Sequence, residues 1–475
     1  MTPIAVFVTI VAYFVAMAFV SWLSGRGKGG QEVFYTGGRK THWAVVAFAM
    51  IGSCMSGVTF VSVPGMVGTS GFGYLQMCIG FFLGYLVIAF VLTPLYFKLN
   101  VVSIYQYLEK RFGMGAYRTG AWFFFVSKML GASVRLFLVC LTLQLLLFGP
   151  MGLPFWLNVL CNVGVCLAYT FRSGVKSVIW TDVLKTVCMI VAVTLCVVLI
   201  GRDLGGIKIQ ERVFFFDDVN HPQFFWKQLL GGLFTVIAMT GLDQDLMQRT
   251  LACKDHRDSQ KNLVVSSLLQ TVVIALFLCL GALLYQFAAV HGITETGDKI
   301  FPAVATSGLL PAVVGVLFVL GLVASAYGAG GSALTSLTTS FTVDILRKGD
   351  AVKVRKAVHL GMAVLMVVTI LVFNALNSTS AIDAVYKLAS YTYGPILVLF
   401  AFGILTKKQV KDKYVPIVAI LAPVICLILQ LNSERWFGGY KFSYELLLLN
   451  AALTFLGLCL LIRTNCSFRG HKIKK

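Results

Sequence analysis

Residues 49–73 read AMIGSCMSGVTFVSVPGMVGTSGFG, an apolar stretch that contains several residues unfavourable to a regular helix. Gly52, Gly57, Pro64 and Gly65 lie within a run that is long enough to cross a bilayer. A helix that breaks in the middle of a membrane leaves backbone N–H and C=O groups unpaired, which is tolerated only where the break lines a cavity walled by protein. The stretch therefore predicts a discontinuous membrane helix beside a cavity.

A second interrupted stretch, VIAMTGLDQDLMQRTLACKD at residues 236–255, has Gly241 followed by Asp243 and Asp245. Each interrupted span opens a block of five apolar spans, one over 43–200 and the other over 224–406. Five is an odd number, so the second block enters the membrane from the opposite side. Glycine and proline are common in membrane helices in general, but their corresponding placement in two blocks favours a transporter built as a 5+5 inverted repeat with two discontinuous helices.

The composition of the whole chain is that of an integral membrane protein. Of its 475 residues, 58% are hydrophobic and 12% charged, and the mean hydropathy is +0.86. The apolar runs are continuous, which excludes the alternating pattern of a membrane β-barrel. We expect an all-α integral membrane protein with thirteen transmembrane helices, at roughly 3–24, 43–69, 71–97, 116–148, 153–171, 176–200, 224–250, 262–290, 309–346, 356–376, 379–406, 414–431 and 444–463.

These spans predict a single membrane transporter domain over residues 1–475. Its expected parts are an extra N-terminal helix at 3–24, the first five-helix repeat at 43–200, the second at 224–406, and two extra C-terminal helices at 414–463. The first span lacks a preceding basic region and a small-residue cleavage site, so we expect it to be a retained helix.

The net charge of +20 is distributed over alternate loops. Basic residues gather near 26–40, 98–118, 172–176, 249–261, 347–356 and 407–413 and in the tail at 463–475, whereas the intervening loops hold few. Positive residues mark the cytoplasmic side of a membrane protein. We therefore expect a plasma (inner) membrane protein with its N-terminus outside and its C-terminus in the cytoplasm, and no nucleic-acid partner.

The sequence contains no P-loop, HExxH, GxSxG or nucleotide-binding fingerprint. We therefore expect neither enzymatic activity nor a cofactor, apart from a possible sodium ion. The expected partners are a small-molecule solute, sodium or a proton, and the lipid bilayer. A channel and a solute sensor remain as alternatives. Two different broken helices in one chain argue against a symmetric channel. We expect no signalling domain after the last span, which argues against a sensor.

Four segments together resemble the sodium/solute symporter family, the relatives of proline permease, the sodium–sugar cotransporters and the sialic acid symporters. They are MSGVTFVSVPG at 55–65, GVKSVIWTDVLK at 174–185, DQDLMQRTLACKD at 243–255 and SALTSLTTSFTVDIL at 332–346. The resemblance covers nearly the whole chain. It implies a LeuT-like core and alternating access, in which a solute and sodium bind near the middle of the membrane and the two faces open in turn.

The same resemblance implies where sodium would bind. The family's common site uses carbonyls of the first discontinuous helix together with one carbonyl and two hydroxyls of the eighth core helix. The carbonyl positions correspond to Gly52, Met55 and Ser325, and the hydroxyl positions to Gly328 and Ala329. Glycine and alanine carry no side-chain oxygen, and sodium prefers several oxygen ligands, so the resemblance implies a degenerate sodium site.

Some members of the family have a second cation site that uses a carboxylate of the fifth core helix. It corresponds to Asp182 with Gly331 and Ser332, so this site also lacks one of its oxygens. Lys185 lies three residues after Asp182 on the same helical face. We expect its ammonium group to fill the space of the missing sodium, which would make transport sodium-independent or proton-linked. The alternative is that Lys185 extends to the cytoplasmic interface.

Polar side chains in membrane spans identify the candidate solute site. Arg135 lies deep inside an apolar span, and a guanidinium suits a carboxylate bidentately. The resemblance to sialic acid symporters places Ser56 and Thr59 beside it. We therefore favour an anionic solute, such as an acidic sugar or a small carboxylate. The alternative is an ion pair between Arg135 and a protein acid such as Asp243.

Asp243, Gln244 and Asp245 follow the second break. Asp243 and Gln244 are candidate solute contacts, and for Asp243 a capping role is the alternative. Asp245 is expected instead to cap the broken helix, because a carboxylate satisfies free N–H groups at a helix start. In the stretch at 325–346, the hydroxyls of Thr335, Ser336 and Thr338 are expected to bond back to their own helix.

Overall fold

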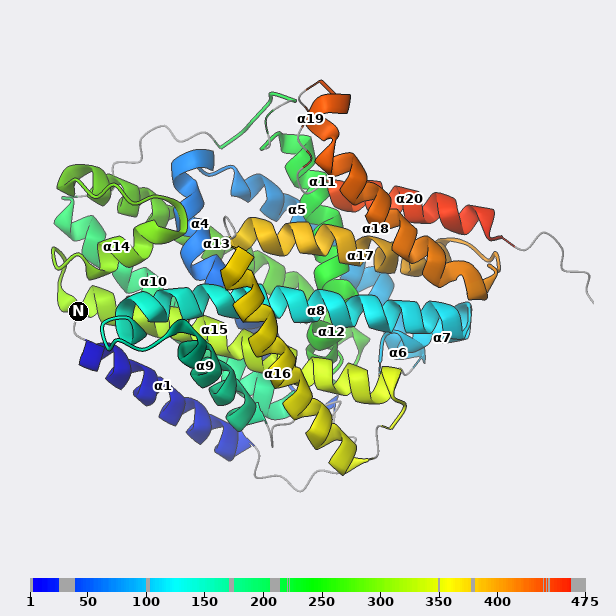
Figure 1. Ribbon diagram of the computed structural model, residues 1–475, viewed down its shortest axis with the longest axis horizontal. Helices are drawn as coiled ribbons and strands as arrows, with labels where there is room; N and C mark the ends of the chain where they lie inside the picture. The colour runs from blue at the N-terminus through cyan, green and yellow to red at the C-terminus, as the bar shows by residue number, and fades with distance from the viewer. Residues whose placement is uncertain are drawn as a thin grey trace, which may run out of the picture.

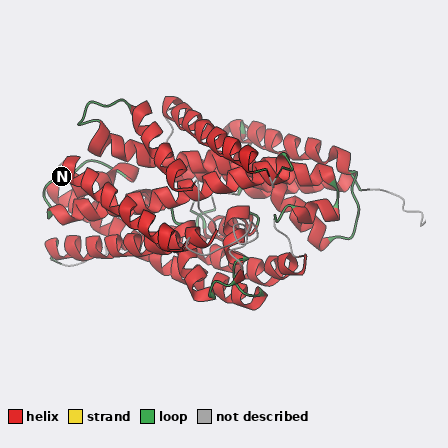
Figure 2. Cartoon of the chain, turned by 90° about the horizontal axis from the view of Figure 1, so that it is seen from below, coloured by secondary structure: helices red, strands yellow, loops and turns green. Residues whose placement is uncertain are grey.

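The computed structural model describes residues 3–24, 39–99, 103–170, 175–205, 214–219, 221, 223–348, 351–376, 381–438, 440, 442 and 445–462. All named elements in these residues are helices, which pack side by side in one elongated body (Figures 1 and 2). Apolar side chains are exposed along the outer helices, as expected for a surface that meets lipid.

In the described residues up to Thr170, eight α-helices form around the first break. They are α1 (Pro3–Ser24), α3 (Trp43–Cys54), α4 (Gly57–Ser70), α5 (Tyr74–Val87), α6 (Thr93–Leu99), α7 (Gln106–Arg111), α8 (Met114–Leu143) and α9 (Phe155–Thr170). A π-helical turn joins α5 to α6 at Ile88–Leu92, and another extends α8 over Gln144–Phe148. The next helix, α10 (Val175–Asp203), carries the segment around Asp182.

The second half of the chain contains the second break. Its helices are α11 (Phe225–Val236), α12 (Gln244–Thr250), α13 (His256–His291), α14 (Ile300–Thr306), α15 (Ala312–Ser340), α16 (Val352–Leu376), α17 (Ala381–Leu405), α18 (Val415–Leu431), α19 (Ser433–Trp436) and α20 (Leu446–Leu460). π-Helical turns extend α11 over Ile237–Gly241 and α15 over Phe341–Ile345, and 3₁₀ turns precede α14 and α18.

Eight helices in the described residues are long and apolar enough to cross a membrane, or up to ten spans if each bent pair counts as one. Three further apolar helices, Val6–Val20, Phe155–Ala168 and Leu446–Leu460, are shorter. The fold is therefore an all-helical membrane fold. The total of thirteen spans, the inverted repeat, and the domain and repeat boundaries remain predictions.

Both breaks expected from the sequence are present. The pair α3 and α4 bends by 64°, and the pair formed by α11, with its π-helical turn, and α12 bends by 75°. At the first break Met55 and Ser56 have extended backbones, and at the second Asp243 is extended. The backbone N–H of Thr41 donates to the carbonyl of Ala252 at 3.3 Å, so the beginning of α3 lies beside the end of α12.

Close packing holds α3 against α10. A Cβ atom at Gly52 would lie 2.4 Å from Thr186 Oγ1 and 2.8 Å from the carbonyl oxygen of Asp182. No side chain fits at these distances, so position 52 requires glycine. This packing places the break in α3 and α4 directly beside the polar residues of α10.

The long helix α8 runs beside α17 through the middle of the molecule (Figure 1). Its first turn is capped from the segment between α17 and α18, because Asp412 accepts hydrogen bonds from the backbone N–H groups of Gly115 at 2.6 Å and Ala116 at 2.7 Å. A carboxylate also favours the positive end of the helix dipole. The cap fastens the helix that carries Lys128 and Arg135.

Helix α13 begins with a similar cap outside the membrane-spanning segment. Asp255 accepts a hydrogen bond from the backbone N–H of Asp258 at 2.8 Å. This bond favours the carboxylate form and lowers the pKa of Asp255.

Candidate functional site

A cavity of about 1200 Å³, counting the part open to solvent, lies beside both breaks. Its polar lining comes from both discontinuous helices and from α5, α8, α13, α15 and α17. These residues are Ser53, Cys54, Ser56, Thr59, Tyr74, Tyr85, Ser127, Lys128, Arg135, Thr235, Thr240, Asp243, Asp245, Gln270, Ser332 and Tyr393. The cavity is the space that the broken helices were expected to line.

The structure brings together most of the predicted solute contacts. Ser56, Thr59, Arg135 and Asp243 all line the cavity. The backbone N–H of Ser56 donates to Thr59 Oγ1 at 3.3 Å, which fixes the start of α4 and leaves the Thr59 hydroxyl proton available to a solute. Gln244 lies apart from this group, because its Oε1 accepts a hydrogen bond from the backbone N–H of Ile104 at 2.8 Å.

Arg135 is the cation that faces the cavity without a carboxylate partner. It is half-buried on α8, and no described residue forms an ion pair or a hydrogen bond with its guanidinium. The pair with Asp243 that the sequence left open is not formed. Asp243 instead binds Lys128 Nζ at 3.0 Å and accepts a hydrogen bond from Tyr393 Oη at 3.1 Å.

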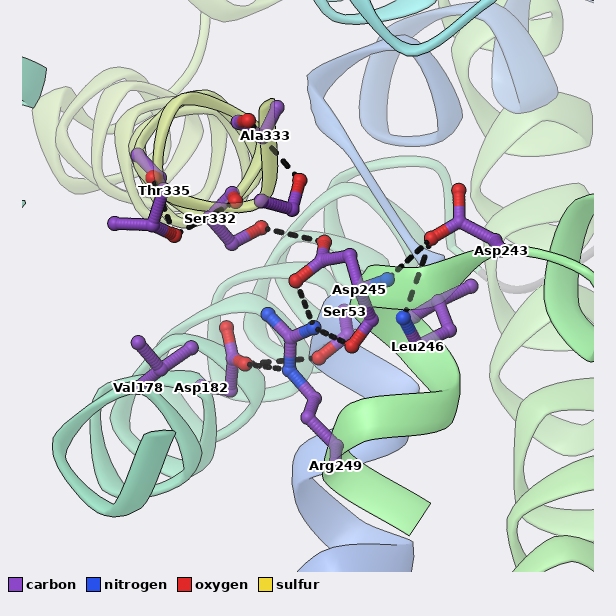
Figure 3. A network of polar contacts seen from close by, with 12 residues as sticks. Ser53, Val178, Asp182, Asp243, Asp245, Leu246, Arg249, Ser332, Ala333 and Thr335 are labelled. Carbon is purple, nitrogen blue, oxygen red and sulfur yellow. Dashed lines mark hydrogen bonds and ion pairs between the residues drawn. The ribbon is translucent and has the colours of Figure 1, made fainter. Parts of the chain in front are cut away.

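A chain of buried ion pairs continues from Asp243 through Lys128 and Asp245, which also line the cavity, to Arg249 and Asp182. Figure 3 shows its Asp245–Arg249–Asp182 part. Lys128 Nζ also lies 3.2 Å from Asp245 Oδ2, and Asp245 Oδ1 lies 2.6 Å from Arg249 Nη1. Arg249 Nε in turn lies 2.9 Å from Asp182 Oδ2. The chain crosses α8, α12 and α10 and is among the most buried polar groups of the protein.

Two hydroxyls complete this ion-pair chain. Ser53 Oγ on α3 donates to Asp182 Oδ2 at 2.9 Å, and Ser332 Oγ on α15 donates to Asp245 Oδ2 at 3.1 Å (Figure 3). Buried charges persist when each is paired and hydrogen-bonded. The chain therefore joins five helices at the breaks.

The two aspartates after the second break have different roles, and that of Asp245 is not the one that the sequence suggested. Asp243, not Asp245, caps α12, since its Oδ1 accepts from the backbone N–H groups of Asp245 at 2.9 Å and Leu246 at 3.3 Å. Asp245 lies two residues further along the chain, in the first turn of α12, and bridges Lys128 and Arg249 instead. The expectation that Asp245 acts as a cap was wrong, because α12 begins at Gln244, two residues earlier than a cap at Asp245 requires.

Lys185 is fully buried, and no described residue is a hydrogen-bond partner of its Nζ. It therefore does not extend to the membrane interface. It does not pair with Asp182 either, because Arg249 and Ser53 hold that carboxylate. Asp182, Arg249 and Arg135 lie close enough to act on the ammonium group electrostatically.

Cations outnumber carboxylates in this region of the described chain. Four cationic side chains, Lys128, Arg135, Lys185 and Arg249, face three carboxylates, Asp182, Asp243 and Asp245. With Lys185 as an ammonium ion, the empty site carries one unbalanced positive charge. An anion in the cavity would balance it.

The residues aligned with sodium sites are only partly described. Met55 and Ser332 line the cavity, whereas Gly52 faces α10 and the Ser325 hydroxyl donates to the carbonyl of Leu322 at 2.9 Å. At Gly328 and Ala329 the structure describes the helical backbone and not the burial of the two residues. The hydroxyl of Thr335 bonds back to the carbonyl of Ser332 at 2.8 Å, and Ser336 and Thr338 bond to their own helix in the same way, as expected.

Sequence reasoning missed three groups of this site. Arg249 was counted among the basic residues of a cytoplasmic loop, but it is buried, and its partner Asp182 lies 67 residues away. Tyr393 was not among the predicted site residues, although its hydroxyl donates to Asp243. Gln270 carried no signal that would separate it from the other polar residues of a long apolar helix.

Known proteins resemble this chain over most of its length. Residues 34–412 match the model of the sodium:solute symporter family. The chain is 26% identical over 465 residues to the sodium/sialic acid symporter NanT of Aliivibrio fischeri, covering 91% of this chain and 89% of that protein. It is 24% identical over 454 residues to the sodium/sialic acid symporter SiaT of Proteus mirabilis, covering 88% of each.

Other matches are shorter or concern the fold alone. The human sodium/iodide cotransporter is 28% identical over 276 residues, which span 55% of this chain and 42% of that protein. A solved structure of a Na⁺-coupled sialic acid symporter in a substrate-bound, outward-open state superposes with a TM-score of 0.78 at 19% identity, covering 96% of this chain and 97% of that one. The family match covers most of the sequence and the same fold recurs, so the chain belongs to the sodium:solute symporter family.

Proposed function

We propose that this protein is a secondary active transporter that imports a small anionic solute, such as an acidic sugar or a carboxylate, by alternating access. Membership of a family of transporters supports a non-enzymatic role. The cavity beside two broken helices supports a solute site at mid-membrane. The anionic character of the solute goes beyond family membership and depends on this chain's own residues.

One observation carries the proposal of an anion: Arg135 faces the cavity with no carboxylate among the described residues to neutralise it. The acids that line the same cavity, Asp243 and Asp245, are paired with Lys128 and Arg249. A guanidinium retains its charge under all ordinary conditions, and its planar fork matches a carboxylate. Ser56 and Thr59 line the same cavity and offer hydroxyl donors to the solute's oxygens.

Replacement of Arg135 by alanine tests this proposal. Loss of one partner of a desolvated charge pair costs about 2–5 kcal/mol, which corresponds to at least about a thirtyfold loss of affinity. We expect Arg135→Ala to abolish concentrative uptake of anionic solutes into proteoliposomes, and Arg135→Lys to restore part of it. Arg257→Ala, which removes an exposed arginine far from the cavity lining, is the matched control. Retained affinity for the anion in Arg135→Ala would discard the proposal.

We further propose that coupling is sodium-independent or linked to a proton through Lys185. The hydroxyl positions of the common sodium site are Gly328 and Ala329 in this sequence. Lys185 supplies a buried positive charge near Asp182 in place of a bound cation. A change in the protonation state of this amine during the transport cycle would carry one proton with the solute.

Uptake in sodium medium compared with choline medium decides the question of coupling. We expect equal rates in the two media for the unaltered protein, and a rate that depends on an imposed proton gradient. Lys185→Met should remove the dependence on the proton gradient. Strong stimulation by sodium would exclude this form of coupling while leaving the anion site intact.

The second candidate is a sodium-coupled symporter of a sugar or amino acid. Several relatives of this chain are named as sodium-coupled transporters, which favours this alternative. Under this alternative, water or backbone oxygens replace the two missing hydroxyls. Sodium-dependent uptake of a neutral solute that is unaffected by Arg135→Ala would favour it.

The proposed location is the plasma (inner) membrane, with the N-terminus outside and the C-terminus in the cytoplasm. The alternation of basic loops supports this orientation.

A further inference from the structure

A neutral polar cluster forms a second wall of the cavity, on α3, α5 and α13. Tyr85 Oη lies 3.1 Å from Gln270 Oε1 and 3.2 Å from Cys54 Sγ. All three residues line the cavity, and Tyr85 is almost completely buried. The cluster contains no charged group and takes no part in the ion-pair chain.

The chemistry of the three groups fixes the direction of the hydrogen bonds. An amide oxygen accepts and cannot donate, so the Tyr85 hydroxyl donates to Gln270 Oε1. The tyrosine oxygen then retains lone pairs, and the Cys54 thiol is able to donate to it. The amide is oriented as a consequence, with its oxygen held by Tyr85 and its nitrogen directed away from that hydroxyl.

The Gln270 amide nitrogen has no partner in the described part of the chain, although the residue is half-buried and lines the cavity. Gln76 shows the contrasting case of a structural glutamine. Its Nε2 donates to the carbonyls of Gly73 and Gln223, and its Oε1 accepts from the backbone N–H of Phe216. An amide that serves packing is satisfied at both ends, whereas Gln270 is satisfied at one end and presents two N–H donors to the cavity.

We propose that Gln270 is a second solute contact, a neutral donor site that binds a hydroxyl or carbonyl oxygen of the solute, with Tyr85 as the residue that positions its amide. This inference rests on the proposed function, in which Arg135 binds the solute's negative charge. It narrows the substrate class to anions that carry an acceptor oxygen in addition to the carboxylate. Purely aliphatic carboxylates would satisfy Arg135 and leave the Gln270 donors unpaired, which weakens their binding.

Two matched pairs of carboxylates test the proposal by direct binding to the purified full-length protein. Glucuronate is compared with cyclohexanecarboxylate, and lactate with isobutyrate. In each pair the carbon frame is similar and only the first compound carries hydroxyl oxygens. We expect the unaltered protein to bind at least one hydroxylated probe about tenfold more tightly than its aliphatic partner.

Gln270→Met keeps the length of the side chain and removes its donors. We expect this substitution to weaken the binding of that hydroxylated probe about tenfold and to leave the binding of the aliphatic probe unchanged. The selectivity for the hydroxylated probe then disappears. Tyr85→Phe should reduce the selectivity by a smaller factor, because the amide remains but is no longer oriented. Equal weakening of both probes, or no change in selectivity, would overturn the role assigned to Gln270.

A matched control comes from a second tyrosine–glutamine pair outside the cavity. The Tyr391 hydroxyl donates to Gln430 Oε1 between α17 and α18, and neither residue lines the cavity. Gln430→Met removes the same kind of bond, and we expect it to leave binding of all four probes unchanged. A loss of selectivity in this control as well would show a general effect on folding and would also overturn the inference.

The same experiment separates the two proposals. Failure of all four carboxylates to bind the unaltered protein contradicts the proposed anion transport itself. Binding that depends on Arg135 but not on Gln270 leaves the anion site in place and refutes only the donor site.

Discussion

At the scale of single residues, the site contains two buried lysines, one of which is paired with carboxylates while the other is not. Lys128 lies within 3.2 Å of two carboxylates, Asp243 and Asp245. Lys185 is fully buried and has no hydrogen-bond partner among the described residues. Removing one partner of a buried ion pair is costly, whereas removing an unpaired buried charge is not.

We therefore predict opposite effects on stability from the same substitution. Lys128→Met should lower the free energy of unfolding by about 3–5 kcal/mol, because it leaves buried carboxylates short of a counter-ion. Lys185→Met should leave this free energy unchanged or raise it. Reversible denaturant titration of the purified proteins in mixed micelles measures both. Equal losses in the two variants would show that Lys185 has a counter-charge of its own.

The sequence predicted some of these residues because their type is unusual where they occur. Arg135 stands alone in an apolar helix, and the cost of a buried guanidinium marks it without any structure. Arg249 and Gln270 could not be assigned in this way. The role of each depends on a partner from a distant segment, Asp182 in one case and Tyr85 in the other. Such pairings become visible when the helices are packed.

At the scale of elements, the position of a helix start decides the role of neighbouring residues. Both breaks were predictable, since glycine, proline and aspartate interrupt otherwise apolar spans. The first residue of α12 was not, and a helix start two residues earlier than expected made Asp243 the cap and placed Asp245 in the ion-pair chain. Helix boundaries depend on small local differences in energy, whereas the existence of a span depends on twenty or so residues together.

The contact between α3 and α10 gives a prediction about a single methyl group. Gly52→Ala would place a Cβ atom 2.8 Å from the backbone oxygen of Asp182, which cannot move aside as a side chain would. We expect it to lower the free energy of unfolding by about 1–3 kcal/mol and to slow transport, since the first break must shift.

Gly164→Ala is the matched control for this prediction. It also places alanine in a membrane helix, on α9, but a Cβ atom there meets nothing within 4 Å. We expect it to be neutral or to stabilise the protein by up to about 1 kcal/mol through helix propensity. If Gly52→Ala were as stable as Gly164→Ala in the same denaturant titration, the close packing of α3 on α10 would be refuted.

At the scale of the whole molecule, the ion-pair chain joins the two predicted repeats. Asp182 lies on α10 in the first block of helices, and Arg249 lies on α12 in the second. We predict that movement of one block against the other breaks or rearranges this pair, so that the pair stabilises the conformation in which it is formed.

A double-mutant cycle tests this role. We predict that Arg249→Met destabilises the protein strongly, because Asp182 then keeps Ser53 as its hydrogen-bond donor but loses its counter-ion. Adding Asp182→Asn should recover part of the loss, with a coupling energy of about 0.5–3 kcal/mol. Additive effects on the free energy of unfolding would show that the two residues act independently.

The unbalanced charge of the empty cavity has a consequence for the electrical behaviour of the protein. Moving one elementary charge across a membrane potential of 100 mV involves about 2.3 kcal/mol. A site that holds four cations and three carboxylates is electrically neutral once a monovalent anion has bound. The loaded site should therefore reorient between the two faces of the membrane at a rate that does not depend on the membrane potential. If Lys185 keeps its proton throughout the cycle, the return of the empty site carries the net charge, and current recordings on planar bilayers should place the voltage-sensitive step in the unloaded half of the cycle. If Lys185 releases its proton with the solute, the empty site is neutral and its return should not depend on voltage.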